Sequence, residues 1–247
     1  MAICPDAAIT INGRALSPDD MFELPDGERT ANYTQLLALF QKRRSIREFA
    51  ERKVDPEITE KVLKAAKTSP MGLPPSDVNV LVFDTKEKNR EFAEDFCAYL
   101  KSIRWFVSKW FLTLLRPFWG KTNDEVFSKF VRPLVKLYID EMEKGVNLVT
   151  YDAPLAIYFY GSPYCDPADP IIAATTAMYA AESLGLGTCM IGAIHPVIQH
   201  GRKAKKFREK HGIKYPSREG IFVIFGYPAV RYKKGIKRTF ASVTYKE

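Results

Sequence analysis

The residues best suited to chemistry lie at positions 41–49, which read Gln-Lys-Arg-Arg-Ser-Ile-Arg-Glu-Phe. The guanidinium groups of Arg43, Arg44 and Arg47 gather at the end of a predicted helix, and the Ser45 hydroxyl lies among them. An arginine binds phosphate oxygens through a planar fork of N–H donors, and a serine hydroxyl adds a further hydrogen bond. The cluster therefore indicates a phosphate site, although arginine pairs lie more often on a solvated helix face.

Two further segments have the composition of ligand-binding loops. Residues 69–76 contain one glycine and three prolines, which force an irregular path and leave backbone groups free. Residues 185–192 follow an apolar helix and contain three glycines, which allow a backbone to lie against a flat ligand. A plain turn explains the first segment equally well, and a helix C-cap that leads into a strand explains the second.

The composition describes one globular domain with surplus positive charge. The chain has 247 residues, 46% of them hydrophobic, and a formal charge of +8. Its longest apolar runs, of about ten residues, are too short to cross a bilayer, and its first residues lack a secretory-signal pattern. The four cysteines show no paired metal spacing. We therefore expect a cytoplasmic protein without a metal site.

The elements that must position these segments follow from the hydrophobic pattern. It predicts helices at about residues 31–44, 55–68, 87–115, 123–145, 168–185 and 200–210. It predicts strands at residues 78–83, 155–160 and 221–225, each a short apolar run of the kind found in strands covered on both faces. Helices on both sides of a mixed sheet are the natural architecture.

The order of the motifs resembles the FMN-dependent nitroreductase family. These motifs are Arg-Arg-Ser-Ile-Arg-Glu-Phe at 43–49, Ser-Pro-Met-Gly at 69–72, Asp-Ala-Pro at 152–154, the glycine segment at 185–192, and Gly-Tyr-Pro at 226–228 before a basic tail. The resemblance covers roughly residues 35–245. It implies a three-layer α+β fold with a mixed central sheet flanked by helices, and an intertwined homodimer with FMN at the subunit interface.

The same resemblance implies a phosphate site. Its contacts would come from Arg43 and Ser45, with Arg44 between them, and the basic tail would complete it through Arg238 and Lys234.

A second group of residues would surround the flavin ring. Arg47 would reach the ribityl chain or the pyrimidine edge. The backbone of Ile191 and Gly192 would lie near N5 and O4 of the ring. A turn of the second subunit would pack on the ring through the residues that match Pro70, Met71 and Gly72.

The resemblance implies an FMN-dependent oxidoreductase without a dedicated catalytic side chain, because the cofactor supplies the chemistry. Hydride or electrons would pass from NAD(P)H or a ferredoxin-type donor through flavin N5 to a nitroaromatic, a quinone or a similar small acceptor. A flavin-fragmenting or dehalogenating enzyme of the same fold is the first alternative. A basic protein that binds nucleic acid or a membrane surface is a remote alternative. Neither nucleic acid nor a membrane is therefore an expected partner.

Residues 95–145 depart from the family pattern as a longer and more aromatic insert, in which Trp105, Trp110 and Trp119 alternate with basic residues. We interpret the insert as a helix pair that packs as core or dimer interface, in preference to a membrane-surface helix. It could also cover the flavin pocket. The histidines His195, His200 and His211 are expected to lie on the surface or in loops.

The N-terminus carries a fainter resemblance. Residues 3–9, Ile-Cys-Pro-Asp-Ala-Ala-Ile, are similar to the end of a bacterial ferredoxin module. A cubane cluster needs four thiolates, and Cys4 alone cannot hold one. The expected organisation is an N-terminal extension over residues 1–30, which could be a ferredoxin-module remnant, and a flavin-binding domain over residues 31–247.

Overall fold

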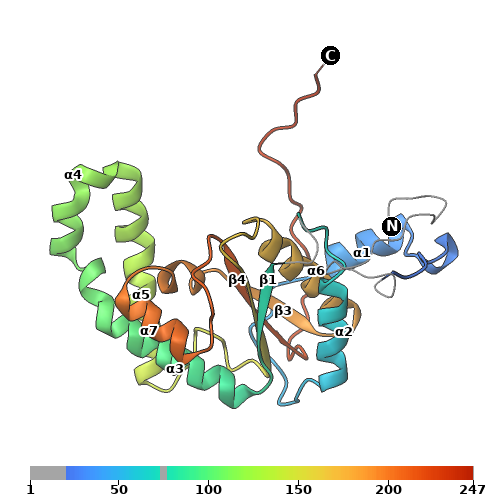
Figure 1. The fold of residues 1–247 in the computed structure, drawn as a ribbon, viewed down its shortest axis with the longest axis horizontal. Helices are drawn as coiled ribbons and strands as arrows, with labels where there is room; N and C mark the ends of the chain where they lie inside the picture. The colour runs from blue at the N-terminus through green and yellow to red at the C-terminus, as the bar shows by residue number, and fades with distance from the viewer. Residues whose placement is uncertain (1–20, 73–76, 247) are drawn as a thin grey trace, which may run out of the picture.

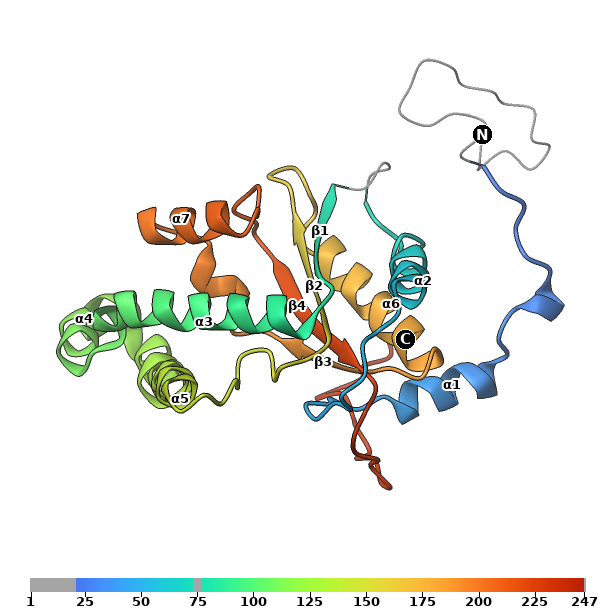
Figure 2. The same ribbon diagram turned by 90° about the horizontal axis from the view of Figure 1, so that it is seen from below.

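The computed structural model describes residues 21–72 and 77–246 (Figure 1). The ferredoxin-like segment with Cys4 and the last part of the proline-rich turn lie outside these residues. The described chain folds into a four-stranded sheet with helices on both faces. Figure 2 shows the sheet between the two helical layers, and this three-layer arrangement confirms the α+β expectation.

The sheet has the strand order β1-β2-β4-β3. Its strands are β1 (Val78–Phe83), β2 (Leu155–Gly161), β3 (Gly187–Ile191) and β4 (Gly220–Gly226). All their pairings are antiparallel, so the expected mixed sheet is wrong for the described strands. The parallel contact that the described residues show is an isolated bridge between Ser45 and Thr188.

Position in the sheet decides how far each strand is covered. The central strands β2 and β4 are buried along their whole length, as their continuous apolar runs predict. The edge strand β1 is covered less, and Val80 is 42% exposed, so the prediction of two covered faces is wrong there. The other edge strand, β3, was not predicted as a strand of its own, because it is short and begins in the glycine segment.

Each face of the sheet supports its own core. On one face, the alanine-rich α6 (Asp169–Ser183) lies close to the strands and packs against α2 (Pro56–Ala66), while α1 (Tyr33–Lys42) contacts α6 from outside. On the other face, α3 (Lys86–Ile103) packs against α5 (Arg132–Glu143) and α7 (Arg202–Lys210), with Phe92 and Phe96 at the centre.

The insert forms a hairpin of helices, which Figure 1 shows standing away from the sheet. The predicted helix over residues 87–115 is wrong, because α3 ends at Ile103 and a 3-10 turn, Arg104–Val107, precedes α4 (Lys109–Val126). Gly120, with φ of 75°, reverses the chain inside α4, and the π-helical Phe127–Val131 leads back into α5. Among the described helices, none combines the length and apolarity that a bilayer span needs.

Two of the three histidines are not surface residues. The ring of His195 is buried, and its Nδ1 lies 2.8 Å from the Tyr158 hydroxyl. The ring of His211 packs against Phe92 and Phe207, and its side chain is 9% exposed. Burial lowers the pKa of both imidazoles. Both side chains therefore belong to the core beside α7.

Candidate functional site

Residues 43–50 cross the end of the sheet and are tied to it by backbone hydrogen bonds. The Ile46 amide donates to the Thr188 carbonyl at 2.9 Å, and the Ala50 amide donates to the Tyr227 carbonyl at 2.8 Å. Farther along, the Ala229 amide donates to the Glu48 carbonyl at 3.0 Å. The backbone that carries Ser45 and Arg47 is therefore fixed to β3 and to the chain that follows β4.

Two glycines allow this close approach. A Cβ atom on Gly187 would lie 2.5 Å from Cγ1 of Ile46, and one on Gly226 would lie 2.6 Å from Cδ1 of Phe49. Any larger residue would push residues 46–49 away from the strands. The glycine segment thus serves first to seat the arginine segment on the sheet.

The cations of this region lack acidic partners. Within the described residues, Arg43, Arg47, Lys234 and Arg238 have no carboxylate oxygen within 4.0 Å. Several helical lysines elsewhere are paired, as Lys61 is with Glu57 at 2.8 Å. Unpaired guanidinium groups on a fixed backbone are suited to an anionic ligand, such as a phosphate group.

Arg44 connects this segment to the basic tail. Its Nη1 donates to the Arg43 carbonyl at 2.8 Å, and a Cβ atom on Gly235 would overlap its Nη2. The backbone next to Lys234 therefore lies against the guanidinium of Arg44. Arg238 lies farther along the exposed tail and, among the described residues, makes no hydrogen bond or ion pair with residues 43–47.

Arg47 lies beside a strained turn that the sequence did not reveal. Its guanidinium carbon is 5.7 Å from the centre of the Tyr151 ring, a cation–π contact. Tyr151 and Asp152 have φ of 53° and 48°, a left-handed conformation that is uncommon for residues other than glycine. Such strain often accompanies functional sites, because the surrounding structure must hold it in place.

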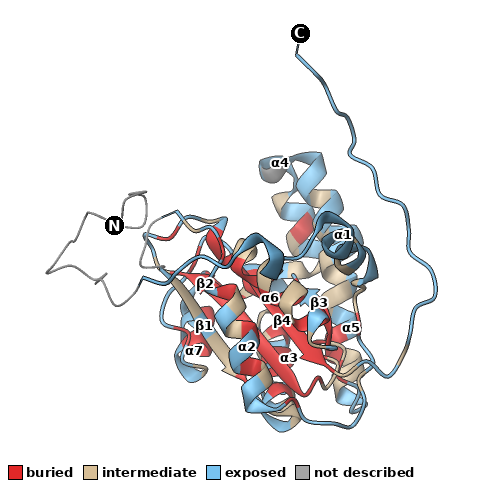
Figure 3. Ribbon diagram, turned by 90° about the vertical axis from the view of Figure 1, so that its right-hand side faces the viewer, coloured by how far each residue is buried: buried red, intermediate tan, exposed pale blue. Residues whose placement is uncertain are grey.

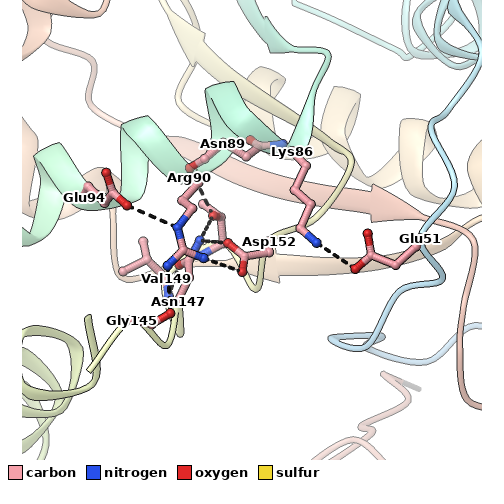
Figure 4. Close-up of polar contacts among 10 residues, drawn as sticks. Glu51, Lys86, Asn89, Arg90, Glu94, Gly145, Asn147, Val149 and Asp152 are labelled. Atoms are coloured by element: carbon pink, nitrogen blue, oxygen red, sulfur yellow. Dashed lines mark hydrogen bonds and ion pairs between the residues drawn. The ribbon is translucent and has the colours of Figure 1, made fainter. Parts of the chain in front are cut away.

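Figure 4 shows the hydrogen bonds that hold this turn. Asp152 accepts from Arg90 Nη1 at 2.9 Å through Oδ2, and from Asn147 Nδ2 at 2.9 Å through Oδ1. Arg90 also donates to the Gly145 carbonyl at 2.7 Å. We infer that Arg90 and Asn147 position Tyr151, and through it Arg47. The Asp-Ala-Pro motif was the one available signal for this network.

A cavity of about 320 Å³ lies next to the turn. Its walls include Phe49, Arg52, Tyr151 and Pro154. Across it, Lys86 pairs with Glu51 at 2.7 Å (Figure 4). Charge in this cavity is therefore partly compensated, in contrast to the free cations of residues 43–47.

The end of β3 is suited to a flat group. Ile191 ends the strand and Gly192 follows it, and a Cβ atom on Gly192 would meet nothing within 4 Å. Thr188, the bridge partner of Ser45, precedes Ile191 by three residues, or about 10 Å along a strand. The Thr188 hydroxyl is buried without a partner among the described residues. Ser45, a predicted phosphate contact, and Ile191, a predicted ring contact, therefore both lie at β3.

The proline turn lies elsewhere in the chain. The Gly72 amide donates to Asp169 Oδ1 at 3.2 Å, at the start of α6, and Pro70 and Met71 precede it. The arginine segment lies near the other end of α6, where Lys42 pairs with Glu182 at 3.5 Å. The 15 residues of α6 span about 22 Å. One chain therefore does not bring the turn to the arginines.

Comparison with known proteins shows the family of this chain. A family model described as "Nitroreductase family" matches residues 40–227. Among curated proteins there is no significant match.

Solved structures share the fold. A nitroreductase with bound FMN from Bacteroides fragilis is 17% identical, with a TM-score of 0.62 over 88% of this chain and 100% of that one. A nitroreductase with bound FMN from Desulfitobacterium hafniense is 24% identical, with a TM-score of 0.60 over the same shares. A BluB-like flavoprotein from Clostridium difficile is 16% identical, with a TM-score of 0.57 over 83% of this chain and 94% of that one.

Proposed function

The chain belongs to the nitroreductase family of FMN-dependent oxidoreductases, and we propose that it passes hydride or electrons from NAD(P)H or a ferredoxin-type donor to a small acceptor such as a nitroaromatic or a quinone. The observation that carries this proposal is the set of cations without carboxylate partners among the described residues, Arg43, Arg47 and Lys234, at a backbone seated on β3. Structures of family members that hold FMN support the choice of ligand.

The donor set fits FMN in its chemistry. Arg43, Ser45 and the tail residues Lys234 and Arg238 would hold the phosphate through charge-assisted hydrogen bonds. Arg44, which contacts Gly235, would keep the tail beside them. The backbone of Ile191 and Gly192 offers the ring an open strand end.

FMN, when bound, supplies hydride chemistry at N5. The protein would bind the flavin, orient it and adjust the charge around it. Arg47, which has no carboxylate partner among the described residues, would place positive charge near the ring, where it would favour added negative charge. The Arg90–Asp152 ion pair, at 2.9 Å, holds the turn on which Arg47 rests.

We further infer a homodimer, in which Pro70, Met71 and Gly72 of one subunit pack on the flavin of the other. Large apolar side chains without cover in the single chain support it: in α1, Tyr33 is 76% exposed, and in the tail, Ile236 and Phe240 are 88% and 84% exposed. Figure 3 shows the exposed tail leaving the body of the chain. The interface should bury at least ~2,000 Å². A flavin-loaded monomer in light scattering at micromolar concentration would contradict this assembly.

Anaerobic reduction tests the proposed function. The purified protein, reconstituted with FMN, should show the visible absorbance of oxidised flavin, which should bleach with NADH, NADPH or reduced ferredoxin and return when a nitroaromatic or a quinone is added. A protein that retains no flavin, or a bound flavin that none of the three donors reduces, would contradict the proposal.

A further inference from the structure

The helical hairpin of α4 has an exposed surface, and none of the candidate site residues lies on it. Its tip, residues 117–121, includes Gly120 at the reversal and lies far from the sheet in both views (Figures 1 and 2). The hairpin contacts the rest of the chain through α5 and the 3-10 turn Arg104–Val107, at its base. Most of its outer surface is therefore free of contacts with the other described residues of this chain.

Apolar side chains form a stripe along this outer surface. Trp110, Leu114 and Phe118 are 63%, 61% and 83% exposed, and their four-residue spacing places them on one face of the helix. On the returning limb Phe130 is 65% exposed. The seam between the limbs is already filled, since Leu112 is 4% exposed. The stripe is thus surplus to the packing of the hairpin. Of the two expected roles of the insert, core or dimer interface, the role as core is wrong for these residues.

Basic residues border the stripe. Residues 109–131 contain four, Lys109, Arg116, Lys121 and Lys129, and two acidic residues, Asp124 and Glu125, so the net charge is four minus two, or +2. Lys109 and Lys121 have no carboxylate partner among the described residues. A binding partner with negative charge at its surface and an apolar layer beneath it would match both the apolar stripe and the basic residues beside it.

We propose that the hairpin, residues 109–131, docks on the surface of an anionic lipid bilayer. Trp110, Leu114 and Phe118 would insert among the acyl chains at the headgroup boundary, and the lysines and arginines would lie at the anionic headgroups. The helix would lie on the membrane and would not span it. The inference goes beyond the proposed function, because it depends on the hairpin alone and not on flavin.

Charge and side-chain type argue against the other occupants. A second copy seated stripe against stripe would bring its own net positive hairpin, so that like charges would face each other. A nucleic acid would satisfy the charge, but its bases stack on aromatic rings and have no need of the aliphatic Leu114 at the centre of the stripe. A bilayer satisfies both the charge and the aliphatic surface.

Vesicle binding tests the proposal on the full-length chain. Vesicles of phosphatidylcholine alone are compared with vesicles that also contain phosphatidylglycerol, in sedimentation at low and high salt. We expect binding to the anionic vesicles that weakens with salt, and little binding to the neutral ones. Replacing Lys109 and Lys121 by glutamine should weaken binding about 30-fold, at roughly 1 kcal/mol for each charge.

A second set of variants separates the stripe from general surface effects. The triple variant Trp110→Ser, Leu114→Ser, Phe118→Ser should lose vesicle binding, while the matched control Tyr164→Ser, at a residue 89% exposed outside the hairpin, should keep it. Unchanged thermal unfolding and flavin content would show that the triple variant folds. Absent binding by the wild type, equal binding to neutral vesicles, or full binding by the triple variant would overturn the proposal. Binding to single-stranded DNA without binding to vesicles would also overturn it. So would a wild type that is oligomeric and does not bind vesicles, together with a triple variant that is monomeric.

Discussion

The arginine segment and the α4 hairpin are both basic, yet they place their charge in different ways. In the arginine segment, Arg43 and Arg47 stand on a backbone that hydrogen bonds fix to β3 and to Tyr227. In the hairpin, Lys109 lies at the start of one limb and Lys121 follows the reversal at Gly120, with exposed Trp110 and Phe118 between them in the sequence. Charge on a fixed backbone at a strand end is suited to one small anion, whereas charge spread beside an apolar stripe is suited to an extended surface.

This contrast shows why net charge alone could not identify a ligand. A third basic stretch, α7, adds several lysines, but Lys205 pairs with Glu209 at 3.7 Å and Lys210 with Asp95 at 2.6 Å. Two of the six cations of α7 are thus paired with carboxylates among the described residues, and Arg208 donates to the carbonyl of Gln199. The positive charge of the chain is therefore spread over three regions that differ in backbone setting and in pairing.

The largest expected effect is at the arginine segment. Arg43→Ala should weaken FMN affinity by about 1.5 to 3 kcal/mol, or about 10- to 100-fold, because it removes a charge-assisted phosphate contact. The matched control is Lys206→Ala, an exposed cation of α7, which should bind FMN like the wild type. Equal affinity of the Arg43 variant and the wild type in a fluorescence titration would remove this arginine from the site.

A substitution of the glycine that contacts the same segment should lower the free energy of unfolding. Gly187→Ala places a methyl group against the buried Ile46 side chain, and overpacking of this kind costs about 1 to 3 kcal/mol of the free energy of unfolding. Gly185→Ala is not a suitable control because its φ is 82°, so we choose Gly27→Ala, where a Cβ atom meets nothing within 4 Å. Urea unfolding measures both variants, and a Gly187 variant as stable as the wild type would show that the segment is not seated on β3.

A smaller effect is expected in the core beside α7. Burial lowers the pKa of His195 and His211 below the ordinary value of 6.5, so the unfolded chain binds more protons than the folded one in this range. The free energy of unfolding should therefore be fully retained above pH 6.5 and should fall as the pH drops below it. Chemical denaturation at pH 7.5, 6.5 and 5.5 measures this, and a double variant with glutamine at both positions should respond less. A free energy of unfolding that rises over the same decrease in pH would contradict the lowered pKa of these two histidines.

The smallest effect is expected at the hairpin. Trp110→Ser removes an exposed side chain, so the free energy of unfolding should change by less than about 0.5 kcal/mol and FMN affinity should stay the same. If this residue covered the flavin pocket, acceptor kinetics would change while FMN affinity did not. A large loss of stability would instead show that Trp110 is packed against another part of the assembly.

Local patterns in the sequence were sufficient to predict most elements of the body. The apolar run of residues 78–83 matches β1 residue for residue. The helices α2 and α6 differ from their predicted ranges by one or two residues at each end. The hairpin was less predictable. Its reversal depends on the positive φ of Gly120, and the aromatic pattern around it predicts burial that the fold does not provide.

Parts of the site depend on contacts between distant segments, and these are not visible in the sequence. Arg90 and Asp152 are far apart in the chain, and the left-handed backbone at Tyr151 depends on that ion pair and not on the tyrosine itself. Tyr151 was therefore missed. The arginine cluster could be predicted, because its residue types alone indicate a phosphate ligand.

The comparison of FMN with riboflavin, which lacks the phosphate, tests the central claim most directly. Titration of the apoprotein should give an affinity for FMN at least about tenfold above that for riboflavin, and Arg43→Ala should reduce this ratio while leaving riboflavin affinity nearly constant. Equal affinity of the wild type for both flavins, or an equal loss for both in the variant, would contradict the assignment of the unpaired cations to the phosphate.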